Sequence, residues 1–303
     1  MLGRSGGEMC DPTDDRACEW MERIDAPPRS VVTSRAGFVR SAFGWARRVG
    51  MALLLAAATP SLADAAPAAS FLDSVYMEYS AGFDYSRGDY GLDRDSSLYY
   101  VPLGLTADYA YWRLRLLVPV LYSDGVTGTQ TFGGPPPPGS DPLESDHNAG
   151  LGDIVTAVSY LFAPATPPMP WIELSGQISW PTRTASNLGT GNFGFSTQID
   201  VFKKIGRITP FARAGRNYYV ADSLGDRFYA SVGASILVVG KTSVGVAYDW
   251  LGSTNKDIED GHEIVPFLSF AASKRWSIGP YAVVGLSDGS PNYGAGFSVR
   301  FRP

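Results

Sequence analysis

Short segments of this chain alternate between apolar residues and polar or small residues, and they recur about every twenty residues from residue 71 onward. The last segment, residues 293–301, reads Tyr-Gly-Ala-Gly-Phe-Ser-Val-Arg-Phe, with an apolar residue at every odd position. A period of two is typical of a β-strand with one apolar and one polar face. The pattern therefore predicts an all-β fold.

The alternation predicts about twelve strands, each of the length that a tilted membrane-spanning strand needs. They cover residues 74–85, 97–108, 112–122, 152–162, 171–180, 193–202, 208–218, 227–237, 242–251, 263–273, 276–287 and 292–302. Short connections alternate with long ones, which is typical of outer-membrane barrels with both termini on the periplasmic side. We predict a transmembrane antiparallel up-and-down β-barrel of about twelve strands.

The polar face of these strands distinguishes a membrane barrel from a soluble one. The outer face of a soluble sheet normally carries many Lys and Glu residues. Here the polar face consists of Gly, Ser, Ala and Tyr with a few Arg and acidic residues, and it contains no lysine. We conclude that the polar face lines a lumen and that the apolar face meets lipid. Five tryptophans at predicted strand ends fit aromatic girdles, and they are Trp112, Trp171, Trp180, Trp250 and Trp276.

The N-terminal part of the chain has the features of an export signal. Arg47-Arg48 is followed by an apolar run, residues 49–58, and then by small residues up to Ala65. The run is too short to span a bilayer, and its flanks are those of a secretory signal peptide. We expect residues 1–65 to be an extension with a cleaved signal, and residues 66–303 to form the barrel in the outer membrane.

Charge and composition limit the partners of the chain. The net charge of -5 and the pI near 5.1 argue against a nucleic-acid partner. No cluster of Cys or His suggests a metal site, and we expect no cofactor. The expected partners are outer-membrane lipid and lipopolysaccharide, periplasmic chaperones and the barrel-assembly machinery, and small hydrophobic solutes. Divalent-cation binding by the acidic loops stays open.

Two stretches resemble a known family. They are residues 150–162, Gly-Leu-Gly-Asp-Ile-Val-Thr-Ala-Val-Ser-Tyr-Leu-Phe, and residues 180–191, Trp-Pro-Thr-Arg-Thr-Ala-Ser-Asn-Leu-Gly-Thr-Gly. Both are similar to motifs of the outer-membrane family "MetA-pathway of phenol degradation". The resemblance implies a barrel and the uptake of hydrophobic or aromatic molecules. The chain departs from the family pattern at Trp180 and Asn192. The glycines of residues 188–191 suit a tight external loop, and Asp153 could cap the neighbouring loop.

Charged residues on the lumen-facing parity are the candidate functional residues. They are Glu78, Asp84, Asp108, Arg113, Arg115, Glu173, Asp200, Arg213, Asp249 and Arg300. Unpaired charges in a narrow lumen are costly, so we expect ion-paired ladders. In these ladders Arg213 would lie across from Gln198 and diagonal to Asp200, and Arg300 would face Glu78. The ladders could form a selectivity filter or a salt-bridge network that fills the barrel.

Inward aromatic residues beside inward glycines are the second candidate group. They are Phe211, Tyr229, Phe267 and Tyr281. Such rings could give the lumen apolar walls for small hydrophobic or aromatic solutes, or they could fill the space that the glycines leave. The long connection 123–151, with four consecutive prolines at 135–138, is stiff and is predicted to constrict the mouth.

These features favour a passive outer-membrane channel or transporter for small hydrophobic or aromatic molecules. Three alternatives remain. The first is an enzyme that modifies membrane lipids, which would need His147 or His262 beside a serine nucleophile. The second is a structural or adhesive barrel with a filled lumen. The third is a soluble periplasmic barrel, which would not fractionate with the outer membrane.

Overall fold

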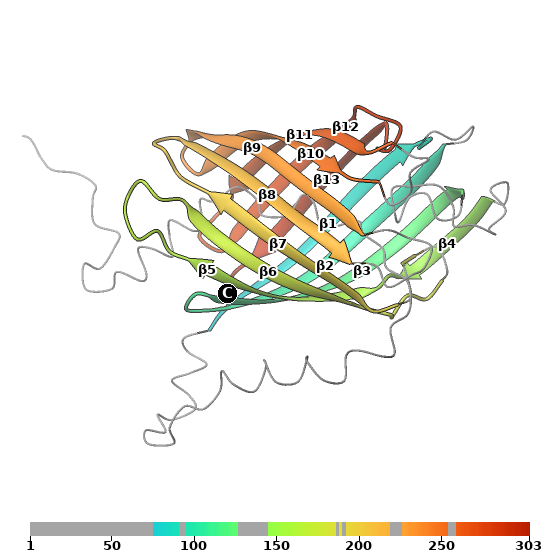
Figure 1. Ribbon diagram of the computed structural model, residues 1–303, viewed down its shortest axis with the longest axis horizontal. Coiled ribbons are helices and arrows are strands. Elements are labelled where there is room, and N and C mark those ends of the chain that lie inside the picture. Colours follow the sequence, from blue (N-terminus) through green and yellow to red (C-terminus); the bar gives the residue numbers. More distant parts are fainter. Residues whose placement is uncertain are drawn as a thin grey trace, which may run out of the picture.

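The computed structural model describes residues 75–90, 95–126, 145–185, 188–189, 192–218, 226–253 and 259–303 (Figure 1). The predicted signal segment, residues 1–65, lies outside these ranges, and its cleavage stays a prediction. Within the described ranges, no helix is long and apolar enough to cross a membrane.

The described residues form thirteen strands in a single antiparallel sheet. In chain order these are β1 (Tyr76–Gly88), β2 (Ser96–Tyr109), β3 (Trp112–Val126), β4 (Ser145–Leu151), β5 (Ile154–Phe162), β6 (Trp171–Trp180), β7 (Gly194–Phe202), β8 (Ile208–Tyr218), β9 (Arg227–Val239), β10 (Thr242–Leu251), β11 (Gly261–Ala271), β12 (Trp276–Gly285) and β13 (Tyr293–Phe301). Twelve of these strands, all except β4, match predicted strands, because the alternation is a local property of each segment.

The sheet closes on itself through the first and last strands. β1 pairs with β13 over nine residues, from Tyr79 opposite Phe301 to Arg87 opposite Tyr293. β1 also pairs with β2, and β2 with β3, so that the wall is continuous. Closure pairs the first strand with the last, so that neither presents an open edge, which a bilayer would not tolerate. The predicted barrel of about twelve strands is confirmed.

β4 and β5 occupy a single position in the wall. β5 pairs with β3 up to Val155 opposite Leu117, and β4 continues the pairing from Leu151 opposite Val120. Gly152 bridges the break by donating its N–H to the carbonyl of Pro119 at 2.9 Å. The thirteen strands therefore occupy twelve positions around the barrel, because β4 and β5 share one position and are separated by a bulge.

β4 corrects the prediction that residues 123–151 form one long connection. β3 extends to Val126, and β4 begins at Ser145. β3 pairs with β4 from Val120 to Val126 and, as far as Asp124, also with β2, so β4 continues the barrel wall at this end. The segment Ser-Asp-His-Asn-Ala-Gly-Leu has no apolar period, because all of its residues except Leu151 are polar or small. Residues 127–144, with the four prolines, lie outside the described residues, so the predicted constriction there stays a prediction.

The turn between β7 and β8 corrects the predicted register. The sequence favoured Gln198 opposite Arg213, whereas the structure places Asp200 opposite Arg213. The reason is that the turn residues are Gly206-Arg207, closed by the bridge between Ile205 and Ile208, and Gly206 has the positive φ of 61° that such a turn requires. A slip of two residues leaves each side chain on its predicted face.

The two ends of the barrel differ as predicted. The short connections, at Ala110, Gly206, Gly240 and Lys274, lie at the end that carries the start of β1 and the C-terminus (Figure 1). Three of the lysines at this end, Lys203, Lys241 and Lys274, follow directly after strands or lie in turns. We call this the periplasmic end, and the opposite end the extracellular end.

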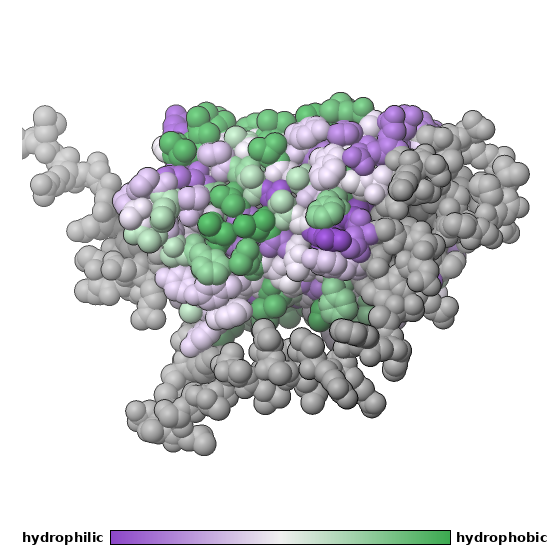
Figure 2. Space-filling view, in the orientation of Figure 1, coloured by the Kyte–Doolittle hydropathy of each residue, from purple (hydrophilic) through white to green (hydrophobic). Residues whose placement is uncertain are grey.

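The outer wall exposes large apolar side chains that a soluble protein would bury. Val232 is 56% exposed, Leu114 59% and Phe297 45%. Figure 2 shows hydrophobic side chains across the visible outer wall. The five predicted tryptophans lie at strand ends or one residue from them, with Trp112 and Trp276 exposed at the periplasmic end and Trp180 at the extracellular end. This apolar wall with aromatic ends is typical of a surface that faces lipid.

A charge on the lipid-facing wall should destabilise the barrel more than a charge in the lumen. We expect Val232→Arg, near mid-strand on β9, to lower the free energy of unfolding by roughly 2–4 kcal/mol, because the guanidinium would lie in hydrocarbon. The matched control is Ser231→Arg, on the neighbouring position of the same strand, whose side chain faces the lumen. Urea titration of the protein in lipid vesicles measures both changes. Equal losses would contradict the assignment of the two faces.

Candidate functional site

The lumen wall is built from every second residue of each strand. All ten predicted lumen charges lie on this inner face, and each is buried or half-buried. Their chain neighbours, such as Leu114, Ile199 and Ala212, are exposed on the outer face. The alternation of burial follows directly from the pleat of a closed sheet. The lumen is therefore where the charged side chains gather.

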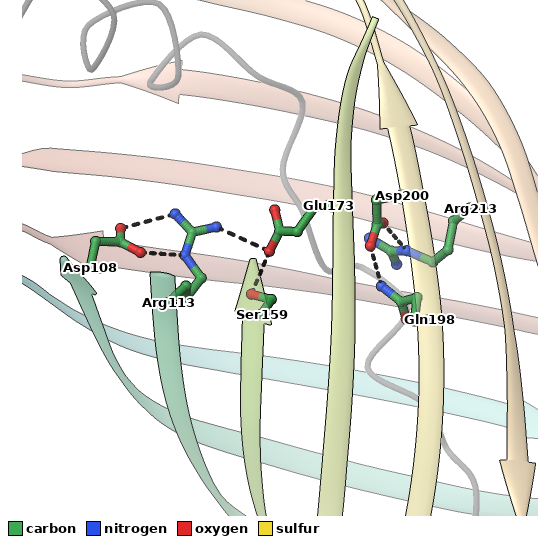
Figure 3. A network of polar contacts seen from close by, with 7 residues as sticks. All are labelled: Asp108, Arg113, Ser159, Glu173, Gln198, Asp200 and Arg213. Atoms are coloured by element: carbon green, nitrogen blue, oxygen red, sulfur yellow. Dashed lines mark hydrogen bonds and ion pairs between the residues drawn. The ribbon is translucent and has the colours of Figure 1, made fainter. Parts of the chain in front are cut away.

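The first polar network joins β2, β3, β5 and β6 (Figure 3). The guanidinium of Arg113 donates two hydrogen bonds to the carboxylate of Asp108, at 2.6 and 2.9 Å. Its third nitrogen, Nη1, lies 3.7 Å from Oε1 of Glu173. The hydroxyl of Ser159 donates to the same Oε1 at 2.7 Å. One arginine thus compensates two acidic residues on the wall of the lumen.

The second polar network joins β7, β8 and β9 (Figure 3). Nε of Arg213 donates to Oδ1 of Asp200 at 2.6 Å, and the amide of Gln198 donates to Oδ2 at 2.6 Å. The hydroxyl of Tyr229 donates to the carbonyl oxygen of Gln198 at 2.8 Å. In the observed register Asp200 lies directly opposite Arg213. Gln198 lies two residues before Asp200 on the same face of β7, opposite Gly215.

The two networks meet between β6 and β7. Glu173 lies directly across from Asp200, and each acidic residue is compensated by an arginine on its other side. The row continues beyond Arg213 through Ser231 to Asp249. Asp108 is near the periplasmic end of its strand and Asp249 near the extracellular end of its own. Because the strands are tilted, the row climbs the lumen as a polar track over one part of the wall.

The remaining lumen charges are placed separately. Asp84 accepts a hydrogen bond from the hydroxyl of Tyr281 at 2.6 Å. Glu78 accepts one from Nε of Arg302 at 2.8 Å, so Arg302 forms the ion pair across the β1–β13 closure that was predicted for Arg300. Arg300 lies opposite Ser80.

Arg115 lies on the inner face of β3, two residues from Arg113, and interacts electrostatically with both polar networks. Its charged neighbours are Arg113 and Glu173 in the first network and Arg213 and Asp200 in the second. This placement joins the networks into one charged region of the lumen wall.

The four predicted lumen aromatics each lie on an inward glycine of a neighbouring strand. A Cβ on Gly245 would lie 2.2 Å from Cζ of Phe267, and one on Gly233 would lie 2.5 Å from Cζ of Phe211. Tyr229 covers Gly215 and Tyr281 covers Gly296 in the same way, at 2.2 and 2.6 Å. Each ring therefore packs over the inward glycine of a neighbouring strand.

Three of these rings also take part in an apolar cluster on the lumen side. Ala247, Val265, Phe267 and Val283 are buried there, and Phe211 and Tyr281 border them half-buried. The centroids of Phe211 and Phe267 are 6.1 Å apart. The cluster lies on β8 and β10–β12, whereas the two polar networks lie on β2–β9. The inner wall thus has a polar part and an apolar part.

The two family-like motifs of the sequence fold against each other at the extracellular end. Oδ1 of Asp153 accepts hydrogen bonds from the backbone N–H groups of Thr182 and Arg183, both at 3.1 Å. Asp153 therefore caps the connection that follows β6, as the sequence suggested. Leu188 of that connection is 1% exposed and packs against Leu98 and Leu121 on the inner face of β2 and β3.

Comparison with known proteins places the chain in a family. Residues 96–302 match the family described as "Putative MetA-pathway of phenol degradation". The chain belongs to this family. The match spans β2 to β13, so it contains both the Gly150–Phe162 and the Trp180–Gly191 motifs. Comparison with the curated proteins found no match.

Solved structures similar to this member of the phenol-degradation family are outer-membrane channels and porins. An outer-membrane channel from Pseudomonas putida F1 is 13% identical, with a TM-score of 0.58, over 81% of this chain and 100% of its own. The KdgM porin is 11% identical, with a TM-score of 0.46, over 73% and 98%. The CymD monoaromatic hydrocarbon channel is 8% identical, with a TM-score of 0.43, over 75% and 88%. At these identities the first similarity supports the barrel fold.

The two histidines lie on the outer face near the extracellular end. Nδ1 of His147 is 2.9 Å from Oδ1 of Asp124, and Nδ1 of His262 is 2.6 Å from the hydroxyl of Tyr248. Among the described residues, no group of three or more His, Cys, Asp or Glu side chains is arranged to hold a metal ion.

Sequence reasoning missed three residues of the lumen. Arg302 shares the inward parity of Arg300, so extending the alternation by two residues would have found it. Ser159 lies on the inward-facing parity of β5, but the sequence analysis selected charged and aromatic residues and therefore passed over a serine. Leu188 lies in a connection without any period, and only the folded structure brings it to β2 and β3.

Removing the central arginine of the first network should destabilise the barrel. We expect Arg113→Ala to lower the free energy of unfolding by on the order of 3 kcal/mol, because Asp108 and Glu173 would lose their common cation inside the lumen. The control is Arg87→Ala, which breaks the exposed pair with Asp95 and should change stability little. Urea unfolding in lipid vesicles measures both. A similar small loss in the two variants would contradict the structural role of the network.

Adding a methyl group beneath an inward ring should disturb the apolar cluster. We expect Gly245→Ala to destabilise the protein by about 1–3 kcal/mol, because Phe267 and the strand must move apart. Gly176→Ala is the control, since a Cβ at Gly176 meets no atom within 4 Å. Thermal unfolding gives the stabilities, and near-ultraviolet circular dichroism reports the ring environment. An unchanged spectrum for Gly245→Ala would contradict the packing of Phe267 on this glycine.

Proposed function

We propose that the protein is a passive outer-membrane channel for small hydrophobic or aromatic molecules. The observation that carries the proposal is the apolar cluster of Val265, Phe267 and Val283 on the lumen side of a closed membrane-spanning barrel. A pore for polar solutes has no need of such a cluster. An apolar wall binds hydrophobic solutes by burial, and Phe211 and Tyr281 at its border add ring stacking.

The two parts of the lumen wall support this class of solute. A small aromatic molecule can lie against the apolar part, and a polar substituent on it can turn toward the networks of Arg113 and Arg213. Family membership agrees with this proposal, because the family is described by a pathway of phenol degradation.

The outer membrane is the proposed site of action. The exposed apolar wall with its tryptophan ends would contact lipid, and lipopolysaccharide would surround the extracellular end. Phe301, which ends the last strand, packs on Trp276 with ring centroids 4.7 Å apart. A C-terminal aromatic residue on the outer face is the proposed signal for periplasmic chaperones and the barrel-assembly machinery, although Arg302 and Pro303 follow it.

We infer that the protein acts without catalysis. His262 contacts Tyr248, and His147 contacts Asp124, so the described contacts of both imidazoles are with residues other than serine. A His–Ser pair would be needed for hydrolysis of a membrane lipid. Substitution of either histidine by alanine should leave the lipid composition of expressing cells unchanged, which thin-layer chromatography of extracted lipids measures.

Uptake of a hydrophobic probe tests the channel directly. Cells with an intact lipopolysaccharide layer exclude N-phenyl-1-naphthylamine, whose fluorescence rises when it enters the membrane interior. We expect the full-length protein to accelerate this rise. Val283→Ser should slow it, because Val283 is 6% exposed within the apolar cluster. The matched control is Val284→Ser, the next residue, which is 48% exposed on the outer face and should leave uptake unchanged.

Each alternative function has its own result in this assay. Acceleration of sugar uptake in a parallel vesicle-swelling measurement, without acceleration of the probe, would identify a channel for polar solutes. No acceleration of either, with the barrel folded by heat-modifiable gel mobility, would indicate a filled structural barrel. Both results would overturn the proposal.

A further inference from the structure

We propose that residues 181–185 and 188–189 form a fixed shelf inside the lumen, and that this shelf sets the size limit of the solutes that pass. The proposal rests on the proposed channel function. This location of the constriction differs from the one predicted from the sequence, which was the proline-rich connection 123–151. The shelf is built by the connection between β6 and β7, and it is held by the bulge between β4 and β5.

The first attachment of the shelf is at Asp153 and Gly152. Both oxygens of the Asp153 carboxylate face the shelf: Oδ1 binds the N–H groups of Thr182 and Arg183, and Oδ2 lies against Gly189. The hydroxyl of Thr182 donates to the carbonyl of Gly152 at 3.0 Å and accepts from the N–H of Ile154 at 2.8 Å. A carboxylate that accepts backbone N–H groups makes strong, directional bonds.

The second attachment is at Leu151. The N–H of Thr184 donates to the carbonyl of Leu151 at 2.9 Å, and the N–H of Leu151 donates to the hydroxyl of Thr184 at 3.0 Å. The shelf therefore continues the pairing of the sheet for a short distance beyond β6. Together with the first attachment, this fixes residues 182–184 to the wall at two separate points.

The tip of the shelf is apolar and lies within the barrel. Leu188 is 1% exposed, and it packs with Leu98, 3% exposed, and Leu121, 8% exposed. Leu98 and Leu121 belong to the inner faces of β2 and β3, so a residue that buries itself against them projects into the lumen. Tyr100 and Ala185 pack against the same group. An external loop that only turned in solvent would not bury its leucine.

The surrounding glycines show that the shelf fits the wall closely. A Cβ on Gly152 would lie 2.5 Å from Cδ1 of Leu121 and 2.7 Å from the carbonyl of Leu188. A Cβ on Gly189 would lie 2.7 Å from Oδ2 of Asp153, and one on Gly150 would lie 2.0 Å from Oγ1 of Thr184. Glycine is needed at each position because the backbone of the shelf and that of the wall approach without space for a side chain.

These contacts assign a role to each of the two sequence motifs. The Gly-Leu-Gly-Asp motif supplies the part of the wall to which the shelf is bound, and the Pro-Thr-Arg-Thr and Leu-Gly segments form the shelf itself. The shelf lies against the inner faces of β2 and β3, where it takes up cross-section of the lumen. Because Leu188 is 1% exposed, its side chain anchors the shelf to the wall and does not line the passage.

The test is single-channel conductance and solute size exclusion of the full-length protein in planar bilayers and vesicles. Leu188→Gly removes the apolar anchor of the shelf, and Asp153→Ala removes the first attachment, so that either change releases the shelf from the wall. We expect each to raise conductance roughly twofold and to admit larger sugars, because the cross-section widens. Asp288→Ala is the matched control: it is the same change at an exposed residue of another extracellular connection, and it should match the wild type.

The outcomes separate this proposal from the proposed function. If the wild type conducts and both variants match it while remaining folded, the shelf does not set the size limit and the proposal is overturned. If the wild type is closed and the variants conduct, the shelf is the constriction. If neither the wild type nor any variant passes ions, sugars or the hydrophobic probe, the channel function fails and this proposal fails with it. Should Asp153→Ala not fold, Leu188→Gly alone decides between these results.

Discussion

Closure of the sheet is the constraint on which the rest of this structure depends. In hydrocarbon no water can bind a free backbone N–H or carbonyl group, so each strand of the wall must pair on both sides. The pairing of β1 with β13, supported by the ion pair of Arg302 with Glu78, satisfies that requirement. Closure also divides the side chains of every strand into an outer set that meets lipid and an inner set that must be compatible with the other inner residues.

The inner residues are arranged so that charge and apolar surface occupy different parts of the wall. Arg113 and Arg213 each compensate acidic residues on neighbouring strands, and the two networks meet where Glu173 faces Asp200. On the later strands, aromatic rings lie on glycines and pack with valines. Such an inner wall offers a small aromatic solute both a nonpolar surface and a polar one, which is the physical basis of the channel that we propose.

The bulge at Gly152-Asp153 connects the wall to the proposed constriction. A bulge bends a strand and leaves backbone groups without ladder partners, and here the connection after β6 uses those groups. Asp153 and Thr182 form the bonds of this junction. This bulge explains why β4 and β5 share one position in the barrel wall. It also explains why Leu188 packs against the inner faces of β2 and β3, because the connection that carries Leu188 is bound to the bulge.

The sequence alone determined the strands, their faces and the ends at which the connections lie, since alternation, turn residues and the positions of Lys and Trp are local signals. It also identified the ten inward charges and four inward aromatics by parity. Only the tertiary structure decided the partners: a two-residue difference in register at Gly206 placed Asp200 rather than Gln198 opposite Arg213, and closure paired Glu78 with Arg302. The pairing of β4, which has no apolar period, and the burial of Leu188 depend on contacts between distant segments, which no local pattern encodes.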